Sequence, residues 1–309
     1  MRVFVAGASG AIGRQLVPRL VQAGHEVHGM TRRKDRRAAL GRLGAVPVVA
    51  DALDPEQVAE AVGAARPDVI VHELTAIGDV DTRRLASSFA ATNRLRTEGT
   101  DHLLSAGRAV GVRTFVAQSN IVAYARTGGP VKSEEDPLDD APARQMRANL
   151  DAIRHLETAV LGAGWTNGIV LRYGWFYGPG TSLARGAEQA ELVRRRRFPV
   201  VGDGGGVWSF VHVADAADAT VAAIERGRRG IYNVVDDEPA RVADWLPAMA
   251  EELGVKPPMR VPRLVGRLAA GETGVVMMTE LRGGTNDKAR RELGWKPAHP
   301  TWRGRLAAA

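Results

Sequence analysis

The stretch VFVAGASGAIG, residues 3–13, decides the fold of this 309-residue chain. Its first four residues are apolar and predict a buried strand, and the apolar spacing that continues to Gln22 predicts a helix. Three glycines, Gly7, Gly10 and Gly13, lie between the strand and the body of the helix. In such a loop the first glycine allows a tight turn, the second lets the backbone approach a phosphate, and the third lets the helix pack closely on the strand. The stretch therefore predicts a strand, a phosphate-binding turn and a helix in succession.

The turn and the helix after it predict a binding site for a dinucleotide. Backbone N–H groups at a helix N-terminus, together with the positive end of the helix dipole, attract phosphate oxygens. The residues expected to contact the cofactor here are Gly7, Ser9, Gly10, Ala11, Ile12, Gly13 and Arg14. The alternative is an ordinary tight turn, but the position between a strand and a helix favours the phosphate site.

The end of the second predicted strand, Glu26–Met30, favours NADP(H) over NAD. An acidic residue at this point binds the ribose hydroxyls of NAD, whereas a basic residue suits the additional phosphate of NADP. The chain continues with Thr31, Arg32 and Arg33, so no carboxylate occupies the position. We expect Arg32 and Arg33 to contact that phosphate and Arg14 to add charge beside it. A solvated basic turn is the alternative.

Three residues after later strands complete the predicted cofactor site. Asp51 follows the strand predicted at Val46–Ala50, and its carboxylate is expected to accept a hydrogen bond from the adenine amino group. A helix cap or a turn is the alternative role for Asp51. Ala52 lies beside it, and Leu74 follows the strand predicted at Asp68–His72, so both are assigned to the cofactor site as well.

Strand and helix signals alternate along the first half of the chain. Further strands are predicted at 114–118, 168–172 and 231–235, an extended segment at 207–213, and helices at 55–62, 82–110 and 144–161. Such alternation indicates a parallel sheet with right-handed crossovers. The predicted fold class is α/β, a Rossmann-type doubly wound parallel sheet with a smaller C-terminal substrate lobe. The dinucleotide-binding domain is expected to comprise residues 1–175 and about 208–238, and the substrate lobe about 176–207 and 239–309.

Composition narrows the classes of function. Hydrophobic residues make up 45% and charged residues 25% of the chain, which is ordinary for a globular protein. The absence of cysteine excludes disulfides, thiolate catalysis and cysteine-ligated metals. No leader-like or membrane-length apolar segment is present, so a cytoplasmic protein without membrane contact is expected. No nucleic-acid-binding motif accompanies the net charge of +7, so we expect a small-molecule substrate, no nucleic acid and no metal site.

Motifs spread over almost the whole chain resemble those of the extended short-chain dehydrogenase/reductase superfamily, in its NAD(P)-dependent epimerase/dehydratase branch. Besides the glycine-rich turn, they are Asp51, Val69–His72, Glu98-Gly99-Thr100, Thr114–Ser119, Leu171-Arg172, Tyr177-Gly178-Pro179-Gly180, Phe210–Asp215, Ile231–Val234 and Leu293-Gly294-Trp295. The resemblance implies a Rossmann fold, a bound nicotinamide dinucleotide and an oxidoreductase, epimerase or dehydratase activity.

The usual catalytic pattern of the superfamily is absent. Its members carry a Tyr-x-x-x-Lys pair on the helix after the fifth strand, in which the ammonium lowers the pKa of the phenol so that it can exchange a proton. No lysine of this chain has a tyrosine four residues before it. Alignment on Glu157 places Asn149 and Ile153 at the Tyr and Lys positions, and alignment on Tyr124 places Asn120 at the family's serine position. The resemblance therefore describes an atypical member.

Residues near the carboxyl ends of the strands are candidates to replace the missing pair, because ligands bind outside those ends. We predict that Ser119, Asn120 and Tyr124 are catalytic. Ser119 or Asn120 would donate a hydrogen bond to a substrate carbonyl, and Tyr124 would supply a proton. Hydrogen bonding to loop backbone and a half-buried tyrosine are the alternative roles. Further candidates are His72, Glu73, Arg172, Tyr173 and Tyr177.

Other conspicuous residues receive different interpretations. His212 and Asp215 are expected to form a structural junction between the lobes rather than a catalytic pair. Trp208 stands where sugar-nucleotide enzymes of the branch tend to have an arginine, which favours a more hydrophobic substrate. The run Arg194–Arg197 is expected on the solvated face of a helix, and the acidic segment 133–140 in a flap or surface loop.

Three functions follow from these residues. The first is an NADP(H)-dependent oxidoreductase that reduces a carbonyl, enone or quinone of a hydrophobic small molecule without the usual Ser/Tyr/Lys set. The second is an NAD(P)-dependent epimerase or dehydratase acting on a sugar nucleotide. The third is a non-catalytic NADP-binding redox sensor or scaffold. A homodimer through the helices at 82–110 and 144–161 is compatible with the sequence, although no apolar stripe requires one.

Overall fold

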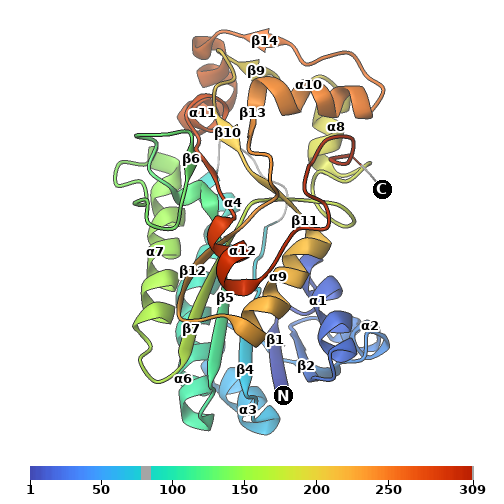
Figure 1. Cartoon of the computed structure of the whole chain (residues 1–309), viewed down its shortest axis with the longest axis vertical. Helices are drawn as coiled ribbons and strands as arrows, with labels where there is room; N and C mark the ends of the chain where they lie inside the picture. The colour runs from blue at the N-terminus through green and yellow to red at the C-terminus, as the bar shows by residue number, and fades with distance from the viewer. Residues whose placement is uncertain (78–84, 308–309) are drawn as a thin grey trace.

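The computed structural model describes residues 1–77 and 85–307 and is built around one large sheet (Figure 1). The sheet consists of β1 (Arg2–Ala6), β2 (Glu26–Thr31), β3 (Val46–Val49), β4 (Val69–His72), β5 (Thr114–Asn120), β7 (Asn167–Tyr173) and β12 (Gly230–Val234). Its seven strands are parallel and follow the order β12-β7-β5-β4-β1-β2-β3. The strand order reverses between β1 and β4, the kind of point at which doubly wound sheets bind ligands. The predicted Rossmann-type α/β fold is confirmed.

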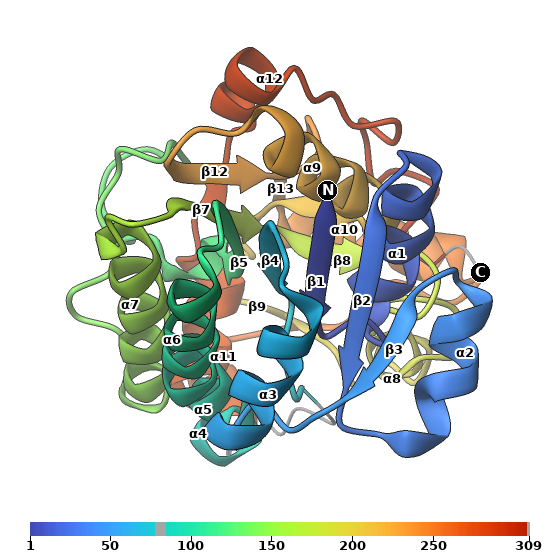
Figure 2. The same cartoon turned by 90° about the horizontal axis from the view of Figure 1, so that it is seen from below.

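Helices cover both faces of this sheet. On one face lie α1 (Ala11–Gln22) and α9 (Val213–Arg226), and on the other α3 (Pro55–Ala65), α6 (Thr100–Val110) and α7 (Arg147–Gly162) (Figure 2). Beyond them, α2 (Arg37–Arg42) packs on β3 and α12 (Asp287–Leu293) on α9. Because both faces are covered, the central strands are apolar on both sides, and Val3, Phe4 and Val5 are fully buried. None of the described helices is long and apolar enough to pass through a lipid bilayer.

Short elements connect the sheet to the rest of the chain. The short strands are β6 (Val131–Lys132), β8 (Trp175–Tyr177), β9 (Val200–Val201), β10 (Val207–Trp208), β11 (Phe210–His212), β13 (Ala240–Arg241), β14 (Arg260–Val261) and β15 (Gly283–Gly284). The short helical turns are η1 (Lys34–Arg36), η4 (Ile121–Ala123) and η5 (Arg144–Met146). The short strands pair only in twos, for example β8 with β11 and β6 with β15, so they link segments that are far apart in the sequence.

A second apolar cluster lies beyond the carboxyl edge of the sheet, in the upper part of Figure 1. It joins α8 (Glu188–Arg194), α10 (Val242–Glu252) and α11 (Arg263–Thr279). Its centre is aromatic: Trp175 and Trp208 stack with their ring centroids 4.1 Å apart, and Trp245 packs against Trp208. Segments before and after β12 both contribute to this cluster. We propose that it is the core of the predicted substrate lobe and that the large sheet belongs to the dinucleotide-binding domain.

The helical stretch predicted at 82–110 is present from Leu85 onward, but it is not one regular helix. Residues 82–84 lie outside the described residues, and the described part begins with two separate short helices, α4 (Leu85–Ser88) and α5 (Ala90–Arg94). A π-helical turn, η3 (Leu95–Gly99), then joins α5 to α6. Such turns contain an additional residue and occur frequently at functional sites. Apolar periodicity does not reveal them, because the helix continues on both sides.

Two predictions in the second half of the chain are also corrected. The run Arg194–Arg197 does not lie on one helix, because α8 ends at Arg194 and Arg196 has a positive φ of 55°. The extended segment predicted at 207–213 ends at His212, since Val213 begins α9. Helix α9 has no counterpart among the sequence predictions.

Candidate cofactor and active site

The carboxyl ends of β1, β4, β5 and β7 meet at one edge of the sheet and face the second apolar cluster (Figure 1). Three buried polar atoms at this edge have no hydrogen-bond partner among the described residues: Glu73 Oε2, Asn120 Oδ1 and Arg172 Nη1. Unpaired polar atoms of this kind are uncommon in protein interiors. The edge therefore carries hydrogen-bonding capacity that a ligand can satisfy.

The glycine turn follows β1 at this edge, and its geometry requires glycine. Gly7 has a φ of 97°, and a Cβ added there would lie 2.6 Å from the carbonyl oxygen of Glu73. A Cβ at Gly13 would lie 2.5 Å from the carbonyl oxygens of Gly7 and Ala8, so the helix packs directly on the turn. The Gly10 N–H donates to the Gly7 carbonyl at 2.9 Å and closes the turn.

The first turn of α1 is open to an anion. Gly10 is its N-cap and supplies no side-chain cap, and no acidic residue lies in the first turn. Ser9 Oγ lies 3.1 Å from Thr31 Oγ1 and ties the turn to the end of β2. Ala11 and Ile12 begin the helix, where N–H groups without an intrahelical partner are available to phosphate oxygens. The cradle fits the phosphates of a dinucleotide.

The arginines expected at a third phosphate lie in different surroundings. Arg32 is exposed, and its guanidinium has no hydrogen bond or ion pair with the other residues that the structure describes. Arg33 donates to both carboxylate oxygens of Asp35, at 3.1 and 2.6 Å. Arg14 lies beside the turn after β8, where a Cβ at Gly180 would lie 2.5 Å from its Nη2. Arg14 is exposed as well, and its side chain has no hydrogen bond or ion pair with the other described residues, so Arg32 and Arg14 can both bind a phosphate without a change of partner, whereas Arg33 would have to leave Asp35.

The remaining predicted cofactor residues are held by the backbone around them. Asp51 Oδ1 accepts a hydrogen bond from the Leu53 N–H at 3.0 Å, which is the turn role weighed as its alternative. The carbonyl of buried Ala52 lies 2.9 Å from His102 Nδ1. Leu74 N lies 3.2 Å from the Cβ that Gly7 lacks, so the chain after β4 adjoins the glycine turn. Their contacts with a cofactor stay predictions.

His72, at the end of β4, is a neutral side chain that joins two parts of the site. Burial lowers the pKa of His72 to about 4. Its Nδ1 accepts from the Leu74 N–H at 3.2 Å, so Nε2 carries the proton and lies 3.2 Å from the Leu95 carbonyl. His72 therefore connects the chain beside the glycine turn to the π-helical turn η3.

Ser119 belongs to a buried ionic group beneath the edge. Its Oγ donates to Glu157 Oε1 at 2.7 Å. Arg172 donates to both oxygens of the same carboxylate, at 2.8 and 2.6 Å. All three side chains are buried. The hydroxyl proton of Ser119 is therefore directed at Glu157, and the serine orients the ion pair.

Asn120 ends β5 and Tyr124 follows it four residues later, but the two side chains are not arranged alike. The Tyr124 hydroxyl donates to Asn233 Oδ1 at 2.8 Å, and the Arg172 guanidinium lies 4.8 Å from the centre of its ring. Tyr124 is 2% exposed, and burial raises its pKa to about 12. Its phenol is therefore neutral at physiological pH and already has an acceptor. Asn120 is half-buried, and its Oδ1 has no partner among the described residues.

Glu73 and the two other candidate tyrosines, Tyr173 and Tyr177, lie on the face covered by α9 or in the second cluster. Burial raises the pKa of Glu73 to about 8, and its Oε1 accepts from the Tyr173 hydroxyl at 3.1 Å. Tyr173 also contacts Thr220 Oγ1 of α9 at 2.6 Å. The Tyr177 hydroxyl donates to the backbone carbonyl of Thr301 at 3.3 Å. These partners explain the burial of both tyrosines without a ligand.

The face of α7 that points toward β5 and β7 carries Asn149, Ile153 and Glu157, one per turn. Ile153 is fully buried among apolar residues. Asn149 Oδ1 accepts from Arg96 Nη1 at 2.6 Å, and both side chains are buried. Sequence reasoning missed Arg96, because an arginine inside a predicted helix carries no local sign of burial.

Trp208 and the histidine–aspartate pair have structural roles. Trp208 is 1% exposed inside the second cluster and donates from Nε1 to the Met277 carbonyl at 2.9 Å, so its ring gives no support to a hydrophobic substrate, which stays a prediction. His212 caps α9 by accepting from the Ala214 N–H. Asp215 holds His299 through its backbone N–H at 2.8 Å and its Nδ1 at 3.1 Å. His212 thus fixes the start of α9, and Asp215 fixes the C-terminal segment at His299. Both roles are those of the expected structural junction.

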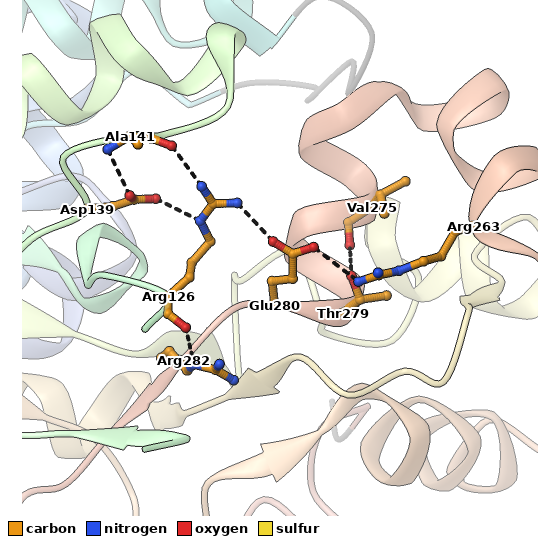
Figure 3. A network of polar contacts seen from close by, with 8 residues as sticks. All are labelled: Arg126, Asp139, Ala141, Arg263, Val275, Thr279, Glu280 and Arg282. Carbon is orange, nitrogen blue, oxygen red and sulfur yellow. Dashed lines mark hydrogen bonds and ion pairs between the residues drawn. The ribbon is translucent and has the colours of Figure 1, made fainter. Parts of the chain in front are cut away.

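The loop between β5 and α7 is fastened to the second cluster by a charged network (Figure 3). Arg126 donates to Asp139 at 3.0 Å and to Glu280, just after α11, at 2.9 Å. Glu280 also accepts from Arg263 at the start of α11, at 3.1 Å. Arg282 donates back to the Arg126 carbonyl at 2.8 Å. Through Asp139 and Arg126, the segment predicted as a flap or surface loop is thus tied to both ends of α11 by ion pairs.

Comparison with known proteins agrees with this architecture. The family model described as "NAD dependent epimerase/dehydratase family" matches residues 3–235. A 3-diazoavenalumate denitrifying reductase from a Streptomyces species is 46% identical over 308 residues, covering 98% of each chain. A ketoreductase from Stigmatella aurantiaca, acting on a 4-hydroxy-2-methyl-3-oxo-4-farnesyl-3,4-dihydroquinoline-1-oxide, is 28% identical and covers 96% of this chain and 92% of its own.

A solved structure shows the same fold over nearly the whole chain. The UDP-glucose 4-epimerase of Thermus thermophilus, in complex with NAD, superposes with a TM-score of 0.75 and 24% identity. The superposition covers 98% of this chain and 96% of the epimerase. The glycine turn, the parallel sheet and these matches confirm the resemblance: the chain belongs to the NAD dependent epimerase/dehydratase family of the extended short-chain dehydrogenase/reductase superfamily.

Proposed function

We propose that this protein is an NADP(H)-dependent reductase that transfers a hydride to an electron-poor aromatic small molecule without a tyrosine–lysine pair. One observation carries the proposal: the active-site face of α7 presents Asn149, Ile153 and Glu157, so neither a phenol nor an ammonium stands there. Tyr124 does not replace them, because its phenol is buried and bonded to Asn233. A reductase with this site must act on an acceptor that does not depend on such a proton donor.

The residues of the glycine turn would hold the cofactor. Family membership supports a nicotinamide dinucleotide, which supplies a hydride when bound in its reduced form. Gly7, Gly10 and the first turn of α1 would bind the diphosphate, and the unpaired guanidinium of Arg32 supports NADP(H) as the preferred form.

An aromatic diazo compound is the acceptor that fits both the site and the relatives. The reductase that is 46% identical acts on a diazo carboxylate and is named for the removal of nitrogen. In the net reaction an aryl diazonium ion and NADPH give the arene, dinitrogen and NADP⁺. One C–H bond forms, the C–N bond breaks, and its electron pair leaves with dinitrogen. No proton enters or leaves, so the reaction needs no general acid.

A carbonyl, enone or quinone is the second candidate acceptor. The ketoreductase relative, although only 28% identical, acts on a conjugated oxo compound. Reduction of such a substrate adds a hydride and a proton. Water or a weak hydrogen-bond donor can supply that proton to a stabilised enolate or hydroquinone anion, so these acceptors remain compatible with the site. Simple ketones, whose alkoxide needs a stronger acid, are expected to react far more slowly.

The test compares acceptor classes with the purified protein. We expect loss of NADPH absorbance with an ortho-diazo derivative of coumarate under argon, together with one headspace dinitrogen per NADPH consumed. Menadione and benzylideneacetone test the second candidate. Substrate-free protein measures the non-enzymatic rate, because diazo compounds decompose unaided.

Three outcomes would overturn the proposal in different ways. No turnover of any acceptor, with tight NADPH binding, would favour the redox sensor or scaffold. Exchange of solvent deuterium into UDP-glucose with a tightly bound nicotinamide would favour the epimerase or dehydratase. Equal efficiency with NADH and NADPH would remove the NADP preference alone.

A further inference from the structure

The strongest unexplained feature beside the site is a buried guanidinium bonded to a buried amide. Arg96 and Asn149 are each 3% exposed, and Arg96 Nη1 donates to Asn149 Oδ1 at 2.6 Å. Burial lowers the pKa of Arg96 to about 10, so its charge remains at physiological pH. A buried charge is costly unless it is paired and hydrogen-bonded. Arg96 has no carboxylate in direct contact among the described residues, and this makes a purely structural role unfavourable.

The bond to Arg96 determines which way the Asn149 amide faces. A guanidinium only donates hydrogen bonds, so the amide oxygen must face Arg96. The amide NH₂ group therefore points the other way. No described residue accepts a hydrogen bond from Asn149 Nδ2, and this nitrogen is not among the fully enclosed unpaired polar atoms. Asn149 thus presents an oriented NH₂ donor that has no acceptor among the described residues.

The position of Asn149 on α7 places this donor beyond the carboxyl end of β5. Glu157 lies level with Ser119, the penultimate residue of β5, because the two side chains are hydrogen-bonded. The helix of a right-handed crossover runs antiparallel to its strands, so residues earlier in α7 lie further outside the edge. Asn149 precedes Glu157 by eight residues, which is about 12 Å along the helix. Its side chain therefore lies at the level where ligands of this fold bind.

The π-helical turn explains how Arg96 comes to face α7. Arg96 belongs to η3, and His72 Nε2 lies 3.2 Å from the carbonyl of Leu95 beside it. Thr100 Oγ1 donates to the Arg96 carbonyl at 2.7 Å and closes the same turn. The hydrogen bond to its carbonyl fixes the backbone of Arg96, and the bond to Asn149 fixes its guanidinium. The side chain therefore loses little conformational entropy when a ligand binds.

We propose that Asn149 binds a carbonyl or phenolic oxygen of the substrate through its NH₂ group and that Arg96 is the positioning residue that orients and polarises this donor. The proposal rests on the proposed function and names the substrate class more closely, as an oxygenated aromatic molecule. A neutral amide beside a cation stabilises negative charge on oxygen without giving up a proton. The Asn149 amide would thus donate a hydrogen bond to the substrate oxygen, whereas a tyrosine at this position would transfer a proton to it.

Kinetic measurements on variants test the donor directly. With the acceptor that the native protein reduces, we expect Asn149→Ala to lower kcat/KM by about 100-fold, as loss of an oxyanion donor does. Asn149→Asp, which replaces the NH₂ group by a carboxylate oxygen, is expected to lower it further. His155→Gln is the control, because His155 is exposed on the same helix and, within the part of the chain that the structure describes, its side chain pairs only with Asp101. It should stay within twofold of the native protein.

A double-mutant cycle distinguishes positioning from a structural role. Arg96→Lys keeps a charge but not the planar fork, and we expect an about tenfold loss in kcat/KM. In the Asn149→Ala background the same change should have little further effect, because the orienting partner has nothing left to orient. NADPH affinity should remain within twofold in every variant. Additive losses, or activity losses that merely follow losses of NADPH affinity, would overturn the proposal.

Binding of unreactive coumarate to the NADP⁺-loaded protein separates this proposal from the proposed function. We expect Asn149→Asp to weaken coumarate at least tenfold and to leave the binding of its non-oxygenated analogue cinnamate unchanged. If no acceptor is reduced but coumarate binding behaves in this way, the reductase assignment fails and the proposed role of Asn149 in binding is retained. If acceptors are reduced and the Asn149 variants match the native protein, only the proposed role of Asn149 fails. If the native protein neither reduces an acceptor nor binds coumarate, both fail.

Discussion

Glu73 places a carboxyl group in the apolar interior at the end of β4, and this has a consequence for stability. Burial raises the pKa of Glu73 from 4.5 to about 8. Between these values the folded protein holds a proton that the unfolded chain releases. The stabilising contribution is therefore complete below pH 4.5 and is lost as the pH rises through about 8.

We predict that Glu73→Gln removes this pH dependence, because glutamine does not titrate. The free energy of unfolding of the native protein should fall relative to that of the variant as the pH rises from 4.5 to 8, by up to about 1.4 kcal/mol per pH unit. Urea unfolding at a series of pH values measures the difference. The matched control is Glu60→Gln, exposed on α3, which should show no such change. Parallel pH profiles for the native protein and Glu73→Gln would contradict the burial of an acid that has no cationic partner.

Arg32 decides the choice between the two dinucleotides if the proposed cofactor is right. Its guanidinium is exposed and unpaired among the described residues, whereas Arg33 is bonded to Asp35. We predict that Arg32→Ala raises the Kd for NADPH by about 10- to 100-fold, as loss of a phosphate contact does, and leaves that for NADH within twofold. Fluorescence titration measures both constants. Arg42→Ala, an exposed change on α2, is the control, and an equal loss for both cofactors would exclude this role.

At the scale of single elements, the glycine turn and α1 form a unit that tolerates no side chain. A Cβ at Gly13 would lie 2.5 Å from three backbone atoms of Gly7 and Ala8. We predict that Gly13→Ala destabilises the protein by several kcal/mol, since a backbone clash of this kind has to move the helix. The control is Gly63→Ala inside α3, where no atom lies within 4 Å. It should stabilise the protein by about 0.5–1 kcal/mol through helix propensity. Thermal unfolding checks both signs.

The link between α7 and the sheet is the buried group formed by Glu157, Arg172 and Ser119. Removing one charge of a buried pair leaves the other without compensation. We predict that Glu157→Gln lowers the free energy of unfolding by about 3–5 kcal/mol. Glu98→Gln, which breaks the exposed pair with Arg94, should cost less than about 1 kcal/mol. A similar loss in both variants on urea unfolding would mean that the buried pair does not hold α7.

At the scale of the whole molecule, the parts predictable from sequence are those with local signals. The glycine spacing and the apolar strand runs were sufficient to predict the parallel sheet and the turn at Gly7. Both features are encoded by residues that are close together in the sequence. The absence of a Tyr-x-x-x-Lys pair was equally visible in the sequence, and it now carries the proposed function. The boundaries of β5 and β7 differed from the predictions by only one or two residues.

The remaining parts depend on contacts between distant segments. Trp208 looks like a substrate contact until the second cluster packs Trp175 and Trp245 around it. Arg96 becomes a buried cation only because η3 turns it toward Asn149, 53 residues later. Ser119 has its partner, Glu157, on α7, and Glu157 in turn is bonded to Arg172 on β7. No local period or motif encodes these pairings, so they emerge only when the sheet and its helices are assembled.

The proposed reaction transfers a hydride from NADPH to the substrate without a proton donor from the protein. The transfer of deuterium from labelled NADPH to the product measures this step directly. The native protein would be incubated with an ortho-diazo derivative of coumarate and NADPH carrying deuterium at the transferable position, and the product examined by mass spectrometry. We expect one deuterium on the carbon that lost nitrogen and none when unlabelled NADPH is used in deuterium oxide. A product labelled only from the solvent, or none formed above the rate without protein, would contradict it.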